Sequence, residues 1–309
     1  GGGEMMTKTV KRDILKPKIT EQTPTVFVMM SGGVDSSVTA AFLKELGFNV
    51  IGVHIKMWSD PSIPCRFIED RHDAMRVAEI LHIPFETWDL TEEYKQAVVE
   101  YMIREYAVGR TPNPDVMCNK HIKFGVMLSR ALARGADYVA TGHYVQVTCD
   151  KGHGTRERHD TCHLSLVAAR DSAKDQSYFL WTLTQEQLKH CLFPIGEYTK
   201  QEVREKARAF GLPTAEKKDS QGICFIGEIN VRDFLKTRIA ASPGHILTTS
   251  GKVVGEHEGL AFYTIGQRHG LDVAGRPATP GASCFPREGG IPYYVSRKDY
   301  ATNALLVAE

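Results

Sequence analysis

The sequence predicts an α/β protein, in which a doubly wound parallel sheet is followed by a small β-rich domain. Two patterns predict this fold. Between residues 25 and 141, short apolar runs alternate with longer stretches whose apolar residues recur at helical spacing. From about Gly244 onward, short β-type runs are separated by glycine and proline. The length of 309 residues, with 42% hydrophobic and 24% charged residues, fits two globular domains and excludes a mainly disordered or fibrous chain.

The alternating region begins with a buried strand over 25–30, which ends at a Ser-Gly-Gly turn. A helix over 36–46 follows, since its apolar residues lie four apart and Gly47 stands where a helix stops. The next elements expected are a strand over 50–55, a helix over 70–81, a strand over 85–90 and a helix from Thr91, which can cap it, to about Tyr106.

A polar loop punctuated by proline is expected over 109–119, before a helix over about 122–134 and a strand over 138–141. The loops that follow three of the strands, over 31–35, 57–60 and 142–143, should gather at one edge of a parallel sheet. Ligands of such sheets bind at that edge, beyond the carboxyl ends of the strands.

After Val145 the alternation stops. Strands over 145–149 and 163–169 are expected around a polar tip, and capping-box patterns at Thr184 and Thr199 open two helices before a loop over 212–227. The domain boundaries expected are 24–230 for the α/β domain, with a helical part at about 170–230, and 231–309 for the β-rich domain. Residues 1–23 are expected to be a tag and a disordered tail, because Gly1–Gly3 is typical of a cloning remnant.

Charge and cysteine content limit the function classes. With 38 Lys and Arg against 37 Asp and Glu, any nucleic-acid surface must be a local basic patch. Seven cysteines, an odd number scattered along the chain, favour a reducing compartment and therefore a cytoplasmic protein. No apolar run reaches the roughly 18 residues that a membrane span needs.

The strongest chemical motif is Ser31-Gly32-Gly33-Val34-Asp35-Ser36-Ser37, between a strand and a helix. Two glycines let the backbone approach an anion, and the helix start offers free N–H groups. The motif lacks the lysine of the common mononucleotide loop, which suits pyrophosphate produced by cleavage between the α- and β-phosphates. Asp35 is then a candidate Mg²⁺ ligand. The alternative is an ordinary glycine turn with a serine cap.

Two cysteines are candidates for reactive thiols. Cys118 follows a stiff polar loop, with Asp115 three residues before it and lysines nearby, and cationic neighbours favour a thiolate. Cys224 lies between Gly222 and Gly227. Each has a structural alternative, a buried loop cysteine for Cys118 and a core cysteine for Cys224. A cluster of cysteine and histidine over 149–163 invites a zinc hypothesis, but a solvated hairpin tip is favoured because the spacing matches no common finger.

Ser31–Ser37 resembles the pyrophosphate loop of the N-type ATP pyrophosphatases, also called PP-loop enzymes. Further segments are similar to the tRNA-specific 2-thiouridylase family in order and content from about Thr25 to the end of the chain. These segments are Gly109–Gly125, with Cys118-Asn119-Lys120 at its centre, Ala140–Tyr144, Lys174–Leu180, Asp219–Gly227 and Tyr263–Arg268.

The resemblance implies a sulfurtransferase that uses ATP, with Mg²⁺, to adenylate the C2 oxygen of the wobble uridine of tRNA. A persulfide on Cys224 would supply sulfur, Cys118 would resolve it to a Cys118–Cys224 disulfide, and Asp115 would act as acid or base. The implied partners are tRNA with a wobble uridine and a persulfide donor, either a cysteine desulfurase or a sulfur-relay protein.

The resemblance also implies binding residues, by matching positions. Nucleotide contacts are expected at Met29, Met30, Ser31, Gly32, Gly33, Val34, Asp35, Ser36, Ile55 and Gly142, and tRNA contacts at Asn113, Pro114, Asp115, Lys174, Asp175 and Gln176. Basic residues considered for phosphate contacts are Lys200, Arg204, Arg208, Lys217, Lys218, Arg232, Lys236 and Arg238. The family's C-terminal β-barrel is expected to be missing.

Two other functions stay open from the sequence. One is an ATP pyrophosphatase that adenylates a small molecule without sulfur chemistry, which would have no use for two reactive cysteines. The other is a catalytically silent homologue that binds tRNA, against which the intact Ser31–Ser37 motif argues.

Overall fold

The computed structural model describes residues 23–60, 67–150, 163–218, 231–273 and 292–309. Two compact units emerge from it, Gly1–Val98 with Pro114–Gly227, and Val99–Asn113 with Glu228–Glu309. Nearly all of the expected N-terminal tail, the segment with Cys224 and most of the cysteine and histidine cluster lie outside the described residues. The expected domain boundaries at 230 and 231 stay predictions.

The first unit is built on a five-stranded sheet in the order β3-β2-β1-β4-β7. Every neighbouring pair of its strands runs parallel, which confirms the predicted doubly wound sheet. The strands are β1 (Thr25–Met29), β2 (Asn49–Lys56), β3 (Phe85–Asp89), β4 (Tyr138–Ala140) and β7 (Cys191–Leu192). In the central strand β1, Val26–Met29 are apolar and buried, as is usual for a strand covered on both faces.

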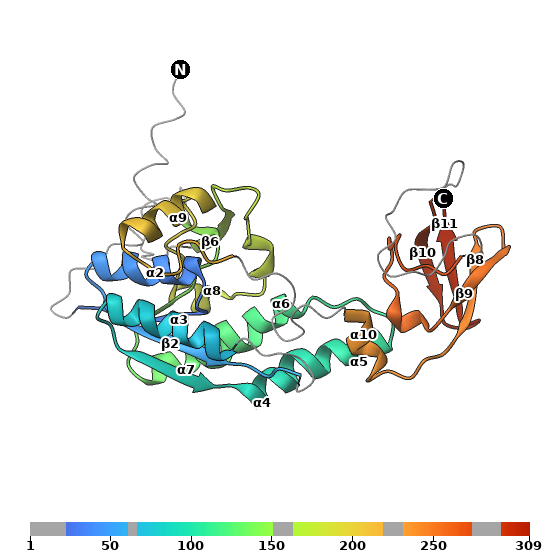
Figure 1. The fold of residues 1–309 in the computed structure, drawn as a ribbon, viewed down its shortest axis with the longest axis horizontal. Helices are drawn as coiled ribbons and strands as arrows, with labels where there is room; N and C mark the ends of the chain where they lie inside the picture. The colour runs from blue at the N-terminus through green and yellow to red at the C-terminus, as the bar shows by residue number, and fades with distance from the viewer. Residues whose placement is uncertain (1–22, 61–66, 151–162, 219–230, 274–291) are drawn as a thin grey trace, which may run out of the picture. The chain divides into compact units, whose positions relative to one another are not determined.

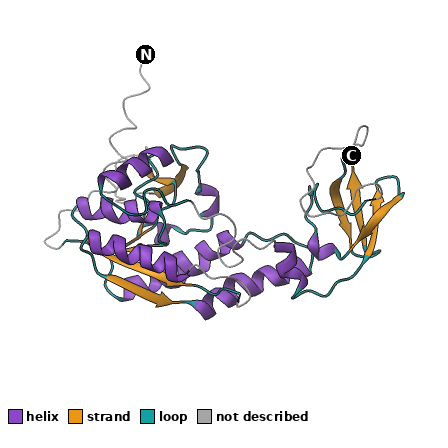
Figure 2. Ribbon diagram, viewed as in Figure 1, coloured by secondary structure: helices purple, strands orange, loops and turns teal. Residues whose placement is uncertain are grey.

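Helices cover both faces of this sheet (Figures 1 and 2). On one face, Val26 and Val28 pack with residues of α2 (Val34–Glu45), α3 (Phe67–Ile80) and α9 (Lys200–Ala209) in one apolar core. On the other face, the Arg134 guanidinium, just after α7 (Leu128–Ala133), lies 5.6 Å from the ring centre of Phe27 and 5.7 Å from that of Trp88. The sheet is therefore sealed on both sides, and its carboxyl edge is left for ligands.

The structure corrects the predicted loop over 109–119. A helix begins at Pro114, as α6 (Pro114–Met117), and continues directly as a π-helical segment, η2 (Cys118–Met127), into α7. Proline at the first helical position and an acidic residue in the first turn both favour a helix start. Cys118 therefore lies within a helix and not in a loop ahead of one. The predicted helix from Thr91 is present as α4 (Thr91–Tyr94), η1 (Lys95–Glu100) and α5 (Tyr101–Ala107).

The rest of the first unit follows the prediction closely. Strands β5 (Val145–Asp150) and β6 (His163–Ala168) pair antiparallel. Both predicted capping boxes are present, with Thr184 before α8 (Gln185–Leu188) and Thr199 before α9. A short 3₁₀ turn, η3 (Ser177–Phe179), lies between β6 and α8 in the chain.

The second unit contains the expected β-rich part, a four-stranded sheet in the order β10-β11-β8-β9. Its strands are β8 (Gly244–Thr248), β9 (Val253–His257), β10 (Tyr294–Asp299) and β11 (Ala304–Ala308). Two short helices accompany them, α10 (Val231–Lys236) and η4 (Leu260–Phe262). The segment Val99–Asn113 belongs to this unit, where the Lys298 ammonium donates to the Gly109 carbonyl at 3.0 Å. Among the helices that the structure describes, none is long and apolar enough to cross a bilayer.

Candidate active site

The Ser31–Ser37 motif forms a tight turn between β1 and α2. Gly32 has φ +81°, and a Cβ added there would collide with the Asp70 carbonyl oxygen. The Ser36 hydroxyl donates to the Gly33 carbonyl at 3.1 Å and accepts from the Ser31 N–H at 3.2 Å. These bonds hold the turn against the start of α2, whose first N–H groups have no partner within the helix. The turn therefore has the form of an anion cradle.

This turn lies where the strand order reverses. The chain passes from β1 outward to β2 and β3, then returns to place β4 on the other side of β1. At the end of β4, a Cβ added to Gly142 would lie 2.8 Å from the Asp35 carbonyl carbon and 2.8 Å from the Ser36 nitrogen. The expectation that the loops after β1 and β4 meet at one edge is confirmed. Such a reversal point is the usual ligand crevice of an open parallel sheet.

Asp35 is the centre of a charged cluster in this crevice. The Lys200 ammonium lies 2.8 Å from each carboxylate oxygen of Asp35, and the Tyr144 hydroxyl donates to one of them at 2.8 Å. The Lys200 side chain is only 14% exposed. A lysine from α9 thus brings a positive charge to a phosphate-type turn that has none in its own sequence.

The residues present fit Mg²⁺ held together with a phosphate. The Asp35 carboxylate stands at the turn, where Mg²⁺ would share it with the Lys200 ammonium or displace that ammonium. Within the described ranges, no cluster of three or more His, Cys, Asp or Glu could hold a metal by itself. Mg²⁺ is usually bound by one or two carboxylates plus phosphate oxygens and water, so a single carboxylate is the pattern expected for it.

The other residues expected to contact a nucleotide line the same edge. Met29 and Met30, at the end of β1, are 8% and 1% exposed. Beside them the Nδ1 of His54 lies 2.7 Å from the Met30 carbonyl oxygen, and burial lowers the pKa of this histidine. Ile55 follows on β2 and is half-buried. Their roles toward a nucleotide stay predictions.

Asp115 and Cys118 lie on consecutive turns of the helix that begins at Pro114. Cys118 is 5% exposed at the first position of η2. Burial raises the pKa of the Asp115 carboxyl, while the charge of Lys123 opposes that rise. A π-helical segment is rare and is found often at functional sites. A carboxyl with a raised pKa, one turn from a thiol, is suited to exchange a proton with it.

The cysteine helix is packed against the end of β4. The ring of Phe124, on η2, has its centre 6.0 Å from that of His143, which directly follows Gly142. Burial, with a smaller effect from Lys123, holds the pKa of His143 well below its ordinary value. The same lysine therefore acts on His143 and on Asp115. Cys118 and the nucleotide turn thus belong to one packed region of the first unit.

A second link runs through Asn119, the residue after Cys118. Its amide nitrogen lies 3.4 Å from the Phe179 carbonyl oxygen in η3. The side chain is buried, and its amide oxygen has no hydrogen-bond donor within the part of the chain that the structure describes. Asn119 therefore positions the η3 turn next to the cysteine.

The segment Lys174–Gln176 leads into η3 and is held in place by its own side chains. Gln176 accepts from the Tyr144 N–H at 3.0 Å and donates its own N–H to the Tyr144 carbonyl at 2.9 Å. The Asp175 carboxylate accepts from Ala169 and Ser177. Although burial opposes this, these hydrogen bonds lower the pKa of Asp175. The expected tRNA contacts of this segment stay predictions, but Asp175 and Gln176 also hold the local fold.

Several basic residues considered for phosphate contacts are engaged within the fold. Lys217 binds Asp70 and Asp73 at 2.7 and 2.6 Å. The Arg204 guanidinium donates to the carbonyls of Ala215 and Lys217. These two side chains therefore tie the segment after α9 to the body of the first unit.

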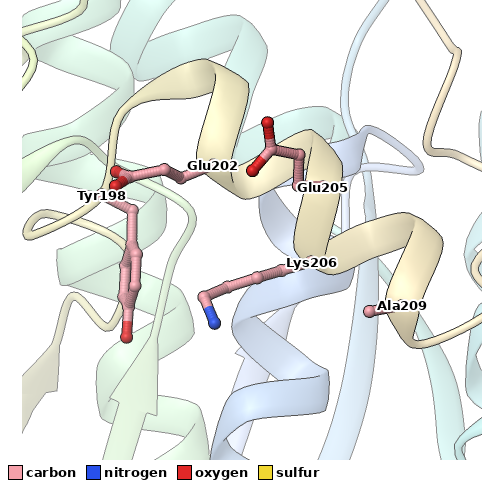
Figure 3. A pocket seen from close by; sticks show the side chains of 5 residues that line it. All are labelled: Tyr198, Glu202, Glu205, Lys206 and Ala209. Carbon is pink, nitrogen blue, oxygen red and sulfur yellow. The ribbon is translucent and has the colours of Figure 1, made fainter.

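A surface hollow beside α9 is separate from the cradle. Figure 3 shows its lining residues, Tyr198, Glu202, Glu205, Lys206 and Ala209. The Lys206 ammonium lies 5.2 Å from the ring centres of both Phe42 and Tyr198. Phe42 stands seven residues after Asp35 on α2, about 10 Å along the helix. None of the residues that line the hollow belongs to the Gly32–Gly33 cradle, although Tyr198 and Glu202 each lie two positions from Lys200.

Sequence reasoning missed three residues of the site. Lys200 was expected to contact tRNA phosphate, yet it binds Asp35. Tyr144 and Asn119 stood in recognisable segments but were given no role. Their roles depend on contacts across 109 and 60 positions of the chain. The one local signal was the aromatic residue directly after Gly142-His143.

Comparison with known proteins gives matches over nearly the whole described chain. Residues 24–228 match the family model described as "tRNA methyl transferase HUP domain", and residues 232–309 match "tRNA methyl transferase PRC-barrel domain". The chain is 48% identical over 286 residues to the tRNA-specific 2-thiouridylase MnmA of Thiobacillus denitrificans, covering 92% of this chain and 75% of that protein. It is 48% identical over 288 residues to the protein of the same name from Streptococcus agalactiae, covering 92% and 72%.

Proposed function

The chain belongs to the tRNA-specific 2-thiouridylase family, and on this premise we propose that it replaces the C2 oxygen of the wobble uridine in tRNA with sulfur, at the expense of ATP. A urea-like carbonyl oxygen is a very poor leaving group. Transfer of AMP from ATP to that oxygen releases pyrophosphate and turns the oxygen into a good leaving group. Sulfur then bonds to C2, and the oxygen departs with AMP.

The cradle at Gly32–Gly33 supports the ATP step. Its N–H groups and the start of α2 suit the β- and γ-phosphates, which leave together as pyrophosphate. Lys200 is placed to balance phosphate charge, since its ammonium already lies at the mouth of the turn on Asp35. Asp35 would hold Mg²⁺, which supplies positive charge to the phosphates as they depart.

The helix from Pro114 supports the sulfur step. We propose that a cysteine desulfurase or a sulfur-relay protein loads a persulfide onto Cys224, which lies outside the described residues. In one route, the Cys118 thiolate attacks the Cys224 sulfur, forms the Cys118–Cys224 disulfide and releases hydrosulfide, which then attacks C2. In the other route, the terminal sulfur of the persulfide attacks C2 first, and attack by Cys118 on the Cys224 sulfur then releases the thiouridine. Asp115 exchanges the proton, and an external thiol reduces the disulfide.

The target base must leave the anticodon stack to reach a thiol beside a buried helix start. We propose that Asn113, Pro114 and Asp115 receive this base, and that Lys174–Gln176 contact the RNA beside it. Shielding from water favours attack by sulfur over hydrolysis of the adenylated base.

One observation carries the proposal: a continuous set of contacts joins the phosphate turn to the cysteine helix. Asp35 accepts a hydrogen bond from the Tyr144 hydroxyl, and the backbone of Tyr144 pairs with Gln176. The η3 turn follows Gln176, and its Phe179 carbonyl accepts a hydrogen bond from Asn119, the neighbour of Cys118. Two chemistries that share one substrate atom need this proximity.

The test is sulfur transfer in a purified system with ATP, Mg²⁺, a persulfide donor and unmodified tRNA, read by mass spectrometry of the nucleosides. We expect 2-thiouridine from the wild type and none from Cys118→Ser or Cys224→Ser. Cys191→Ser is the matched control, because this thiol is buried in β7 and burial raises its pKa far above the ordinary value. Full activity of Cys118→Ser would favour an ATP pyrophosphatase without sulfur chemistry. Absence of tRNA-dependent pyrophosphate release in the wild type would favour a silent homologue.

A further inference from the structure

Two aromatic side chains stand out of the surface directly after Lys174–Gln176. Trp181 is 71% exposed, the highest value for any large apolar side chain in the described ranges, and Tyr178 is 59% exposed. Most large apolar side chains of the first unit are buried around the sheet. Two exposed rings three positions apart are the kind of apolar surface at which proteins bind a ligand or partner.

The backbone that carries these rings is firmly held, so their exposure does not come from a loose loop. The Asp175 carboxylate accepts from the Ser177 N–H at 3.3 Å and from its hydroxyl at 2.8 Å. Phe179 and Leu180 donate their N–H groups to the carbonyls of Gln176 and Ser177. Leu180, between the two exposed rings, is fully buried and anchors the turn. The ring of Tyr178 rests on that of Phe179, with centres 4.0 Å apart.

The turn bridges the two halves of the candidate active site. At its start, Gln176 pairs with the backbone of Tyr144, whose hydroxyl binds Asp35 beside the phosphate cradle. At its end, the Phe179 carbonyl accepts from Asn119, next to Cys118. Tyr178 and Trp181 are therefore carried by a turn that contacts both the residues beside the cradle and the residue next to Cys118.

We propose that Tyr178 and Trp181 form a stacking platform for unpaired bases of the anticodon loop that flank the target uridine. This inference rests on the proposed function and adds to it the residues that hold the RNA while its target base is extruded. Bases that lose their stacking neighbour can recover it on an aromatic side chain, which is the usual way that proteins hold unpaired RNA. Aromatic stacking accepts every base, so one platform serves several anticodons.

The chemistry of the turn favours nucleobases over phosphate or a protein partner. The exposed residues of the turn itself are Tyr178 and Trp181, whose planar rings offer little to a phosphate group. Lys174 precedes the two rings in the sequence by four and seven positions, so the segment supplies one positive charge before its exposed aromatic residues. That order suits a backbone phosphate followed by stacked bases.

The test measures RNA affinity separately from sulfur transfer. A 17-nucleotide anticodon stem–loop with an unmodified wobble uridine is titrated into the 309-residue chain, followed by fluorescence anisotropy of a label on the RNA. For Trp181→Ala we expect a Kd about 5- to 150-fold weaker, and for Tyr178→Ala a smaller loss in the same direction. Trp181→Phe should stay within about 3-fold of the wild type, because phenylalanine still stacks. Leu46→Ala is the control, since Leu46 is exposed at the far end of α2.

Intrinsic fluorescence gives a second readout. RNA should quench the tryptophan emission of the wild type and should quench much less in Trp181→Phe at the same fractional saturation. If Trp181→Ala binds the stem–loop as tightly as the wild type, while the wild type thiolates tRNA, the platform is overturned and the proposed function stands. A third outcome is that Trp181→Ala binds RNA normally and transfers sulfur from free sulfide, but no longer transfers sulfur from a protein persulfide donor. In that case the surface binds the donor protein, and the proposed stacking platform is wrong. If the wild type transfers no sulfur at all, the proposed function itself fails.

Discussion

The Lys200 ammonium contacts both carboxylate oxygens of Asp35 at 2.8 Å, joining residues 165 positions apart. Asp35 is in the first turn of α2, two residues after Gly33 of the cradle, and Lys200 is the first residue of α9. The pair brings a positive charge to a phosphate turn whose own sequence contains none. It also fixes where α9 begins relative to the sheet edge.

Replacing Lys200 by methionine should impair ATP use more than folding. The variant loses the cation at the mouth of the cradle and leaves Asp35 with the Tyr144 hydroxyl. We expect tRNA-dependent pyrophosphate release to fall about 100-fold in kcat/KM, the usual scale for one lost electrostatic contact to a leaving group. Lys206→Met is the matched control, because Lys206 lies on the same helix but over the rings of Phe42 and Tyr198. Equal losses in both variants would show that only the net charge matters.

The two glycines of the cradle should respond differently to alanine. Gly32→Ala places a Cβ against the Asp70 carbonyl at φ +81°, so it should lower the melting temperature. At Gly33 the nearest atom to an added Cβ is the Ser31 hydroxyl at 3.5 Å, and φ is −92°. Gly33→Ala should therefore melt like the wild type yet bind ATP more weakly, because the methyl group stands where phosphate approaches. Calorimetry measures both quantities. If Gly33→Ala bound ATP as tightly as the wild type, the phosphates of ATP would not bind against the Gly33 side of the turn.

Asp115→Asn should separate stability from activity. Burial raises the pKa of Asp115, so the folded chain binds this proton more tightly than the unfolded chain does. Ionisation therefore works against folding, and stability falls as pH rises from the ordinary aspartate value of 3.8 through the raised value. At pH 7 the asparagine variant should melt at or above the wild-type temperature, by about 2 °C, and the difference should vanish below about pH 4. Sulfur transfer should be lost. A variant that is less stable at pH 7 would instead give the carboxylate a structural role.

Much of this architecture could be predicted from local pattern. The run Thr25–Met29, the glycines after it and the capping boxes at Thr184 and Thr199 each depend on neighbours within a few residues, and each was predicted correctly. The segment around Asp115 was predicted as loop because it is polar and contains two prolines just before Asp115. The second proline occupies the first helical position, where its missing N–H costs nothing.

Local pattern could not supply the contacts that make the site. Nothing near Lys200 indicates that its ammonium lies on Asp35, and nothing near Asn119 indicates a bond to the Phe179 carbonyl. The strand β7 has two residues, too few for a periodicity to be seen. These features follow from the order of strands in the sheet, which brings the ends of β1 and β4 together.

His143 should make the free energy of unfolding depend on pH below the ordinary histidine pKa of 6.5. It is 7% exposed, with Nδ1 2.7 Å from the Thr141 hydroxyl, and burial, followed by the charge of Lys123, holds its pKa well below 6.5. As pH falls through 6.5, the unfolded chain binds a proton at this histidine and the folded chain does not, so the free energy of unfolding decreases by up to about 1.4 kcal/mol per pH unit.

The variant His143→Gln tests this, because glutamine retains a polar partner for Thr141 but has no group that binds this proton. The free energy of unfolding, measured with urea at pH 7.5, 6.5 and 5.5, should therefore fall less steeply with decreasing pH in the variant. The difference between the two slopes should correspond to close to one proton. Some pH dependence should remain in the variant, because burial also lowers the pKa values of His54 and His257. An unchanged slope would mean that water reaches the end of β4, and the packing of Phe124 against His143 would then not shield the cysteine helix.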